Sequence, residues 1–276
     1  MSSPSFIPRV LTVAGSDPSG GAGIQADLKA FSALGGYGAS VITALTAQNT
    51  QGVRGVHPVP AAFIAQQLEA VLDDIRLDAV KIGMVASLEV AEVIAEALRA
   101  RRPRWIVLDP VMVAKSGDVL VDDAGIRAVR DVLVPLADVI TPNLPEAAVL
   151  LDAPTPTTTA EMASLVKPLT ALGAPYALLK GGHLKGEQCS DLLATPARYE
   201  WLSALRVATH NLHGTGCSLS SAIAATLARL PAASTDADAV AAIGKAKRWL
   251  HAALEASERL NVGQGCGPVH HFHAWW

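Results

Sequence analysis

The stretch RVLTVAGSDPSGGAGIQADLKAFSAL (Arg9–Leu34) joins an apolar segment, a glycine-rich turn and a helical pattern in one unit. Residues Arg9–Ala14 are rich in the β-branched and aliphatic types that are typical of a strand. After the turn, apolar side chains recur at helical spacing, namely Ile24, Leu28, Phe31 and Leu34. This order of strand, turn and helix decides the fold, because the chain goes on to repeat it.

The rest of the chain alternates short apolar segments with longer helical ones. Further strands are predicted at Ala39–Leu45, Ala79–Ile82, Trp105–Leu108, Val139–Thr141 and Tyr176–Leu179, and further helices at Ser87–Arg99, Thr215–Leu230 and Asp236–Leu260. Such alternation predicts parallel βαβ units with helices on both faces of the sheet. Two segments do not follow this alternation, namely Gln51–Val59 and Glu187–Val207. They are predicted to be irregular or antiparallel strands at an edge or flap. We therefore expect one α/β domain over residues 1–276.

Composition excludes several classes of protein. Half of the 276 residues are apolar and 17% are charged, so the chain is expected to fold around a sizeable core. The net charge of −3 argues against a nucleic-acid partner, and no apolar run is long enough for a membrane span. Three cysteines without CxxC spacing predict neither a disulfide framework nor a zinc site. No signal peptide is visible at the N-terminus, so a reducing cytoplasm is the expected compartment.

The first glycine-rich turn has the G-x-x-x-x-G spacing of a P-loop between Gly15 and Gly20. The lysine and hydroxyl residue that should follow are replaced by Gly21 and Ala22, and no G-x-G-x-x-G is present either. We therefore expect the turn to approach some partner closely while nucleotide phosphates bind elsewhere.

The strongest signal for phosphate binding is HGTGCSLSSAIAATLA, residues 213–228. Gly214 and Gly216 free the backbone just before a helix, and exposed N–H groups at a helix N-terminus form an anion hole. Thr215 adds a hydroxyl, and Cys217 lies at the helix start, where the pKa of a thiol is expected to fall. The alternative is an ordinary helix cap followed by a buried cysteine.

Oxygen ligands follow two of the predicted strands. Asp109 ends WIVLD, and TPNLPEA places Asn143 and Glu146 three residues apart at the start of a helix. Carboxylate and amide oxygens suit magnesium, so this edge of the sheet is a predicted magnesium site. The alternative for Asn143 and Glu146 is a capping box.

Other polar residues follow strands or face inward. Lys180 and Gly182 come after a buried strand in LLKGGHL, where the lysine either contacts a phosphate or lies on the surface. Asp27 belongs to the inward face of the first helix and needs a partner or a ligand there. Gln48 and Asn49 lie just past a strand, and amides of this kind suit a heteroaromatic ring with an amine and ring nitrogens.

The motifs AGSDPSGGAGIQAD, TALTAQNT, KIGM, DPVM, TPNLPEA, KGGH and HGTGC occur in this order. With them the chain resembles the ribokinase-like superfamily and, within it, the hydroxymethylpyrimidine/phosphomethylpyrimidine kinases of thiamine biosynthesis. The resemblance implies a three-layer αβα sandwich with a central, mostly parallel sheet in a single domain that forms a homodimer. It also implies transfer of the γ-phosphoryl group of ATP, first to an aminopyrimidine alcohol and then to its monophosphate.

The resemblance also assigns roles to residues. It implies that the first glycine-rich turn serves the pyrimidine ring, with contacts from Gly15, Asp27, Gln48, Met84 and Val111. Lys180, Gly182, Thr215 and Asn143 are implied for ATP, and Asp109 and Glu146 for magnesium. Gly214, Gly216 and Cys217 are implied at the catalytic centre, where Cys217 replaces the aspartate base of related sugar kinases and accepts the hydroxymethyl proton.

Two competing functions remain at this point. Pyridoxal kinase belongs to the same superfamily, but some relatives with that activity carry a second cysteine after DPVM, in the region where this chain has Ala114. A sensor that binds the pyrimidine without chemistry would not need Asp109, Glu146 and Cys217 together. The segment Val111–Leu120 is predicted to be a flap that closes on the ligand, and the His- and Trp-rich tail is predicted to pack on the body.

Overall fold

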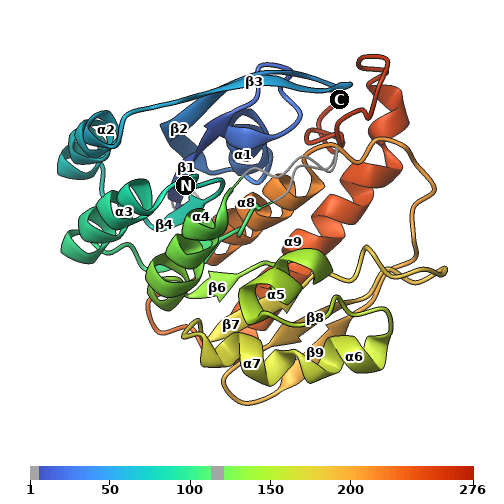
Figure 1. Ribbon diagram of the computed structural model, residues 1–276. Helices are drawn as coiled ribbons and strands as arrows, with labels where there is room; N and C mark the ends of the chain where they lie inside the picture. The colour runs from blue at the N-terminus through green and yellow to red at the C-terminus, as the bar shows by residue number, and fades with distance from the viewer. Residues whose placement is uncertain (1–5, 113–120) are drawn as a thin grey trace, which may run out of the picture.

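The computed structural model describes residues 6–112 and 121–276. A nine-stranded sheet forms its centre, with the strand order β3-β2-β1-β4-β5-β6-β7-β8-β9 (Figure 1). The parallel strands are β1 (Arg9–Ser16), β2 (Tyr37–Asn49), β4 (Ala79–Ile82), β5 (Trp105–Leu108), β6 (Val139–Ile140) and β7 (Tyr176–Leu179). The antiparallel strands are β3 (Gly52–Pro58) at one edge and β8 (Asp191–Ala194) and β9 (Tyr199–Leu202) at the other.

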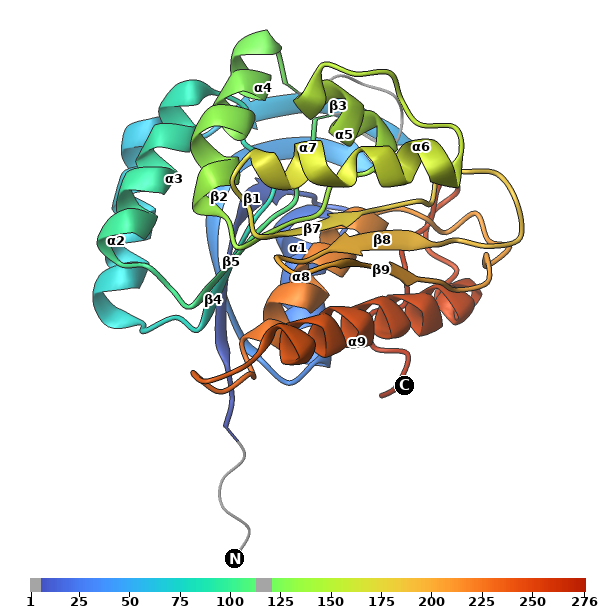
Figure 2. The ribbon, with the colours of Figure 1, turned by 90° about the horizontal axis from the view of Figure 1, so that it is seen from below.

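Helices cover both faces of the sheet, as Figure 2 shows from below. One face carries α2 (Ala61–Asp74), α3 (Leu88–Ala100), α4 (Asp123–Ala128), α5 (Leu144–Leu151), α6 (Thr159–Ser164) and α7 (Val166–Ala171). The other face carries α1 (Gly23–Ala33), α8 (Thr215–Leu227) and α9 (Asp236–Glu255). A separate apolar cluster fills the space on each side of the sheet. The expected three-layer αβα architecture is therefore confirmed.

Strands β4, β5 and β7 have the predicted bounds, because each is a short, fully apolar or buried run between polar turns. The two segments that do not follow the alternation do contain the antiparallel edge strands. The last helix was predicted to run to Leu260, but α9 ends at Glu255 and a short 3₁₀ turn, Ser257–Arg259, follows. Helix α2 was not predicted, although its sequence AAFIAQQLEAVLDD is amphipathic.

The register of the sheet brings the ends of its central strands level. Ile82 pairs with Leu108, and Leu108 pairs with Ile140, so the residues that follow these strands emerge at one edge. In open parallel sheets ligands bind beyond the carboxyl ends of the strands. This edge is therefore where a site is expected.

The C-terminal segment packs against the body of the domain. The backbone N–H of His213 donates to Gly267 O at 3.0 Å, and His271 Nε2 lies 2.9 Å from Ser218 Oγ on α8. His270 and His271 are buried, whereas Trp275 and Trp276 are exposed. The tail thus braces the start of α8, as predicted in outline. Within the described ranges, no helix has the length and apolarity needed to cross a bilayer.

Candidate active site

A pocket of about 720 Å³ opens at the carboxyl edge of the sheet. Its size falls in the range of small-molecule sites, roughly 300–1,000 Å³. Every predicted site residue except Asp27 lines it: Gly15, Gln48, Met84, Asp109, Val111, Asn143, Glu146, Lys180, Gly182, Gly214, Thr215, Gly216 and Cys217. Residues from both ends of the chain therefore meet in one cavity. The predicted flap lies largely outside the described residues, which omit 113–120.

The turn before α8 presents backbone N–H groups to this pocket. Gly214 precedes the helix with φ +72°, and no side chain caps the helix N-terminus. A Cβ at Gly216 would lie 3.4 Å from Lys180 Nζ and 3.5 Å from Asp109 Oδ2. The first turn of α8 therefore faces a lysine and a carboxylate. A helix N-terminus with a nearby lysine is suited to bind phosphate.

Lys180 connects the two carboxylates of the site. Its Nζ donates to Asp109 Oδ1 at 3.0 Å and lies 3.8 Å from Glu146 Oε2. Burial favours neutral Asp109, but the charges of Lys180 and Lys81 outweigh it and lower the pKa of that carboxyl. Burial raises the pKa of Glu146 to about 7. The charge of Lys180 acts to lower this pKa, and the charge of Asp109 acts to raise it further. One lysine thus neutralises one carboxylate and leaves the second ready to ionise when a cation arrives.

Asn143 and Glu146 form the capping box that was the alternative interpretation of this pair. Asn143 Oδ1 accepts from the Glu146 N–H at 2.8 Å, and Glu146 Oε2 accepts from the Asn143 N–H at 2.7 Å. The two interpretations are compatible, because both residues also line the pocket. The cap fixes where the Glu146 carboxylate stands.

The expectation of a lowered pKa at Cys217 is wrong. Burial raises the pKa of this thiol to about 11, and the nearby carboxylates of Asp27 and Asp109 act in the same direction. Lys81 opposes them without reversing the shift. The sequence placed Cys217 correctly at the helix start, but it did not show that the thiol lies near the carboxylates of Asp27 and Asp109. Cys217 is therefore a protonated thiol at neutral pH.

Asp27 does not reach the pocket, so the prediction that it contacts the ring directly is not supported by its position. Its side chain is fully buried, and Lys81 Nζ lies 2.9 Å from its Oδ2. Thr12 Oγ1 and Ser221 Oγ also donate to it, each at 2.6 Å. The inward carboxylate found a partner within the protein. Lys81 itself lines the pocket, so Asp27 lies one layer behind the wall.

The glycine-rich turn approaches the protein itself rather than open space. A Cβ at Gly21 would lie 2.3 Å from His213 Cδ2, so only glycine lets the turn pack against that ring. The turn is held by Asp17, whose Oδ1 accepts from the N–H and hydroxyl of Ser19. Gly15 faces Met84 across the pocket wall, with 3.0 Å between a Cβ at Gly15 and the methionine methyl.

Sequence reasoning missed the far half of the pocket. Lys247 of α9 donates to Asp191 Oδ2 of β8 at 2.6 Å and to Cys189 O at 3.0 Å, and all three residues line the cavity. A signal was present, because Lys247 lies four residues after Ile243 and three before Leu250 on the buried stripe of α9. A lysine on such a stripe needs a partner. The contact of His213 with Asp17 was also missed, although His213 opens the motif HGTGC.

Comparison with known proteins gives consistent matches. The sequence model described as phosphomethylpyrimidine kinase matches residues 17–270. The chain is 52% identical over 266 residues to the hydroxymethylpyrimidine/phosphomethylpyrimidine kinase of Salmonella typhimurium, covering 96% of this chain and 98% of the relative. It is 51% identical over 266 residues to the Rhizobium meliloti protein of the same name, with 96% and 97% coverage.

Solved structures resemble the chain as well. An ADP complex of Bacillus subtilis pyridoxal kinase superposes with a TM-score of 0.87 at 35% identity, covering 98% of this chain and 99% of that one. The phosphomethylpyrimidine kinase of Clostridium difficile gives a TM-score of 0.75 at 41% identity, covering 88% and 98%.

Proposed function

The chain belongs to the phosphomethylpyrimidine kinase family, and from this premise we propose how its pocket carries out phosphoryl transfer. The enzyme phosphorylates 4-amino-5-hydroxymethyl-2-methylpyrimidine to the monophosphate and then to the diphosphate, a reaction of thiamine biosynthesis. The family match over residues 17–270 and the full-length relatives of the same name support this activity. The phosphoryl donor is ATP, since related kinases have been solved with ADP and with AMP-PCP.

One observation supports the placement of the transferring phosphate more than any other. Lys180 is fixed on Asp109 at 3.0 Å and faces the first turn of α8 across the position of Gly216. The N-terminus of α8 and the ammonium group of Lys180 thus border the same part of the pocket. Backbone N–H groups and ammonium groups both bind phosphate oxygens, so we propose that the terminal phosphates of ATP bind here. Gly182 and Thr215 also line the cavity.

The residues present fit a magnesium ion. Asp109 and Glu146 are buried carboxylates at one end of Lys180, and a cation there would favour the ionised form of Glu146. Magnesium in phosphoryl-transfer sites is held by one or two carboxylates, substrate phosphates and waters. We therefore assign Asp109 and Glu146 to magnesium, with Asn143 orienting Glu146 beside the nucleotide. When bound, the ion neutralises charge on the phosphates.

Catalysis rests on positioning and charge stabilisation, because the transition state of phosphoryl transfer is loose. Lys180 and the N–H groups from Gly214 to Cys217 stabilise the charge on the moving group. Burial raises the pKa of the Cys217 thiol to about 11, so only a small fraction of the enzyme carries a thiolate at neutral pH. This thiolate accepts the proton of the hydroxymethyl group. Because the loose transition state needs little proton abstraction, the base must lie near the acceptor oxygen but need not be fully ionised.

The acceptor ring occupies the end of the pocket near the first glycine-rich turn. Gly15, Gln48, Met84 and Val111 line that end and offer one amide among apolar groups. A flat ring with nitrogen acceptors matches such a wall. Lys81 in the pocket wall is already paired with Asp27. It therefore stabilises the wall and does not offer an unpaired charge to the ligand.

We also propose a homodimer and a cytoplasmic location. Strand β3 is an edge strand of the sheet, and the β2–β3 ribbon exposes Leu45, at 47%, on the face opposite to that of Val56. Exposed edges and apolar side chains on one ribbon suit association with a second copy. Sedimentation of the purified protein tests the dimer, and a charged substitution at Leu45 should shift it toward monomer.

A coupled assay of ATP consumption tests the activity. Wild-type protein is given the aminopyrimidine alcohol, its monophosphate or pyridoxal, and the products are identified by mass. We expect turnover with the first two acceptors and about two ATP consumed per alcohol at completion. Pyridoxal is the informative third arm, because pyridoxal kinases are among the structural neighbours. Turnover with pyridoxal alone would refute the proposed substrate.

A further inference from the structure

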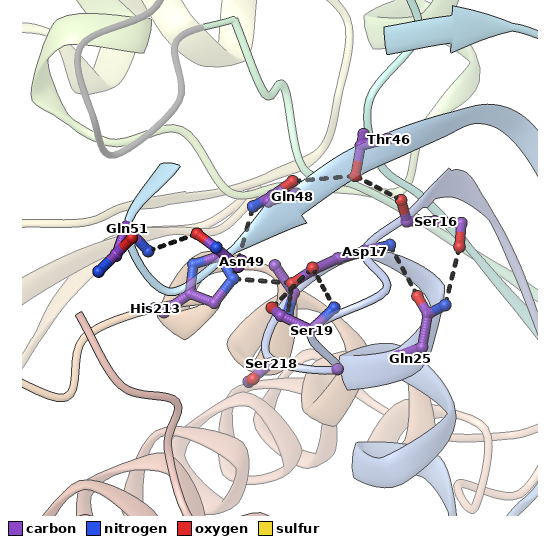
Figure 3. A network of polar contacts seen from close by, with 12 residues as sticks. Ser16, Asp17, Ser19, Gln25, Thr46, Gln48, Asn49, Gln51, His213 and Ser218 are labelled. Carbon is purple, nitrogen blue, oxygen red and sulfur yellow. Dashed lines mark hydrogen bonds and ion pairs between the residues drawn. The ribbon is translucent and has the colours of Figure 1, made fainter. Parts of the chain in front are cut away.

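We propose that His213 is a positioning residue that ties the acceptor-side loop, Asp17–Gly23, to the phosphate-binding turn at the start of α8. The inference rests on the proposed function, since it assigns the acceptor to one of these segments and the phosphate to the other. His213 directly precedes Gly214, the residue at the helix N-cap. Its ring points back across the pocket rim to the loop (Figure 3).

The side chains of His213 and Asp17 are in direct contact. His213 Nε2 lies 2.7 Å from Asp17 Oδ2, and the two side chains are 13% and 3% exposed. The same Oδ2 accepts from the Ala22 N–H at 2.8 Å, so the carboxylate holds the loop and the ring at once. Figure 3 shows this carboxylate at the centre of the network. A contact of this length between largely buried groups restricts both segments.

The backbones of the loop and the turn also fit closely together. A Cβ at Gly214 would lie 1.8 Å from Gly21 O, so the turn and the loop touch without a side chain between them. The His213 N–H donates to Gly267 O, which fixes the turn from the other side. A shift of the loop relative to the turn therefore requires the ring to leave Asp17. The relative placement of acceptor and phosphate is set at this point.

The contact with Asp17 determines which nitrogen of the His213 ring carries a proton. Burial opposes ionisation of Asp17, but hydrogen bonds from His213, Ser19 and Ala22 lower the pKa of its carboxyl overall. An ionised carboxylate only accepts, so His213 Nε2 carries a proton. Gln48 Nε2 lies 3.5 Å from the same nitrogen, and two donors form no hydrogen bond.

Gln48 lines the pocket beside the His213 ring. Its Oε1 lies 3.2 Å from Thr46 Oγ1, and the Thr46 hydroxyl also donates to Ser16 O at 2.9 Å. Because His213 Nε2 gives its proton to Asp17, the ring stays next to the Gln48 side chain without bonding to its amide nitrogen. His213 therefore positions the acceptor through the loop, next to an amide that lines the pocket.

The test compares His213→Gln with His210→Gln, an exposed histidine three residues earlier on the same segment. For His213→Gln we expect the acceptor KM to rise about tenfold and kcat to fall about 10- to 100-fold. The KM for ATP should stay within about twofold, and ATP should be hydrolysed without acceptor phosphorylation. His210→Gln should match wild type. A fall in kcat with unchanged acceptor KM and unchanged coupling would overturn the proposal.

A double-mutant comparison separates loss of the His213–Asp17 contact from general damage to the loop. In an Asp17→Asn background the carboxylate is gone, so His213→Gln should cost less than about twofold further. Effects that multiply in the double variant would show that His213 does not act through Asp17. If wild-type protein does not phosphorylate the aminopyrimidine at all, the proposed function is refuted, whereas the positioning role of His213 is not.

A measurement on wild-type protein covers the case in which the variants do not fold. The ¹⁵N spectrum of histidine-labelled enzyme, with His213 assigned through its backbone, reports the state of Nε2. We expect a protonated Nε2 across neutral pH, with a chemical shift that moves when Asp17 is replaced. An unprotonated Nε2 would overturn the proposal, since Gln48 would then donate to the ring.

Discussion

Lys81 and Asp27 form an ion pair from which solvent is completely excluded. Nζ lies 2.9 Å from Oδ2, and both side chains are 0% exposed. Asp27 comes from α1 and Lys81 from β4, so the pair joins a helix to the sheet directly below the pocket wall. Burial alone would lower the pKa of Lys81, and the charges of Asp27 and Asp109 raise it overall. Lys81 is therefore charged at neutral pH.

Removing one partner of this pair should be far more harmful than removing both. Lys81→Met leaves a buried carboxylate without a counter-charge, and we expect a loss of about 3–5 kcal/mol in the free energy of unfolding. The double variant Lys81→Met/Asp27→Leu should recover much of that loss. Urea denaturation of the wild type, the two single variants Lys81→Met and Asp27→Leu, and the double variant measures it. A double variant as unstable as the sum of the single ones would contradict this account.

The pH profile of turnover should report the thiol of Cys217. Because burial raises its pKa to about 11, the thiolate fraction grows with pH throughout the neutral range. We expect kcat to rise up to about tenfold per pH unit between about pH 7 and pH 9. Cys217→Ala should lose this dependence and most of its turnover while keeping its affinity for ATP. A flat wild-type profile would remove the thiolate from the reaction.

Glu146 should make the free protein less stable as pH rises. Its pKa is about 7 in the folded state against 4.5 for the ordinary group, so between these values the folded protein holds a proton that the unfolded chain has released. Stability therefore falls as pH rises through this window. Without magnesium, Glu146→Gln should have a higher Tm than wild type at about pH 8, and the difference should shrink toward about pH 5.

Glu161 provides a control of opposite sign. It also stands in the first turn of a helix, but at the surface, where hydrogen bonds from Thr157 lower the pKa of its carboxyl. Glu161→Gln should lower Tm at neutral pH, and the difference should disappear as pH falls below the ordinary range for glutamate. Equal behaviour of the two variants would mean that the position in the helix, and not burial, governs both.

Two glycines of the phosphate-binding turn should respond differently to alanine. Gly214→Ala places a Cβ 1.8 Å from Gly21 O at φ +72°, so we expect a marked loss of stability. Gly216→Ala meets only Lys180 and Asp109 at ordinary contact distances, so its Tm should stay close to that of wild type. Its methyl group would occupy the proposed phosphate space, and kcat/KM for ATP should fall about 10²-fold. Unchanged kinetics in Gly216→Ala would place the phosphates elsewhere.

The sequence predicted the residues of the site better than their states. Lys180, Asp109 and Gly216 were each found because polar or small residues follow apolar strands or precede a helix, and parallel strands end at one edge. The state of Cys217 was not predictable in the same way. Its pKa depends on which distant charges the fold places beside the thiol, and Asp109 is more than a hundred residues away in the chain.

Asp27 shows the same division. Helical spacing placed its carboxylate on the inward face of α1, and elementary electrostatics required a partner there. Whether that partner is a ligand or Lys81 depends on the pairing of β1 with β4, which the sequence pattern does not reveal. In the folded protein the partner is Lys81, and Asp27 lies behind the pocket wall.

By itself the sequence determined the layered α/β architecture, the parallel centre of the sheet and the glycine turn ahead of α8. These follow from periodicity and backbone freedom, which are local properties of the chain. Tertiary structure alone decided how Asp17 meets His213 and how Lys247 meets Asp191. Contacts between residues far apart in the chain depend on how whole elements pack, because interaction energy falls steeply with distance in space and is indifferent to distance in sequence.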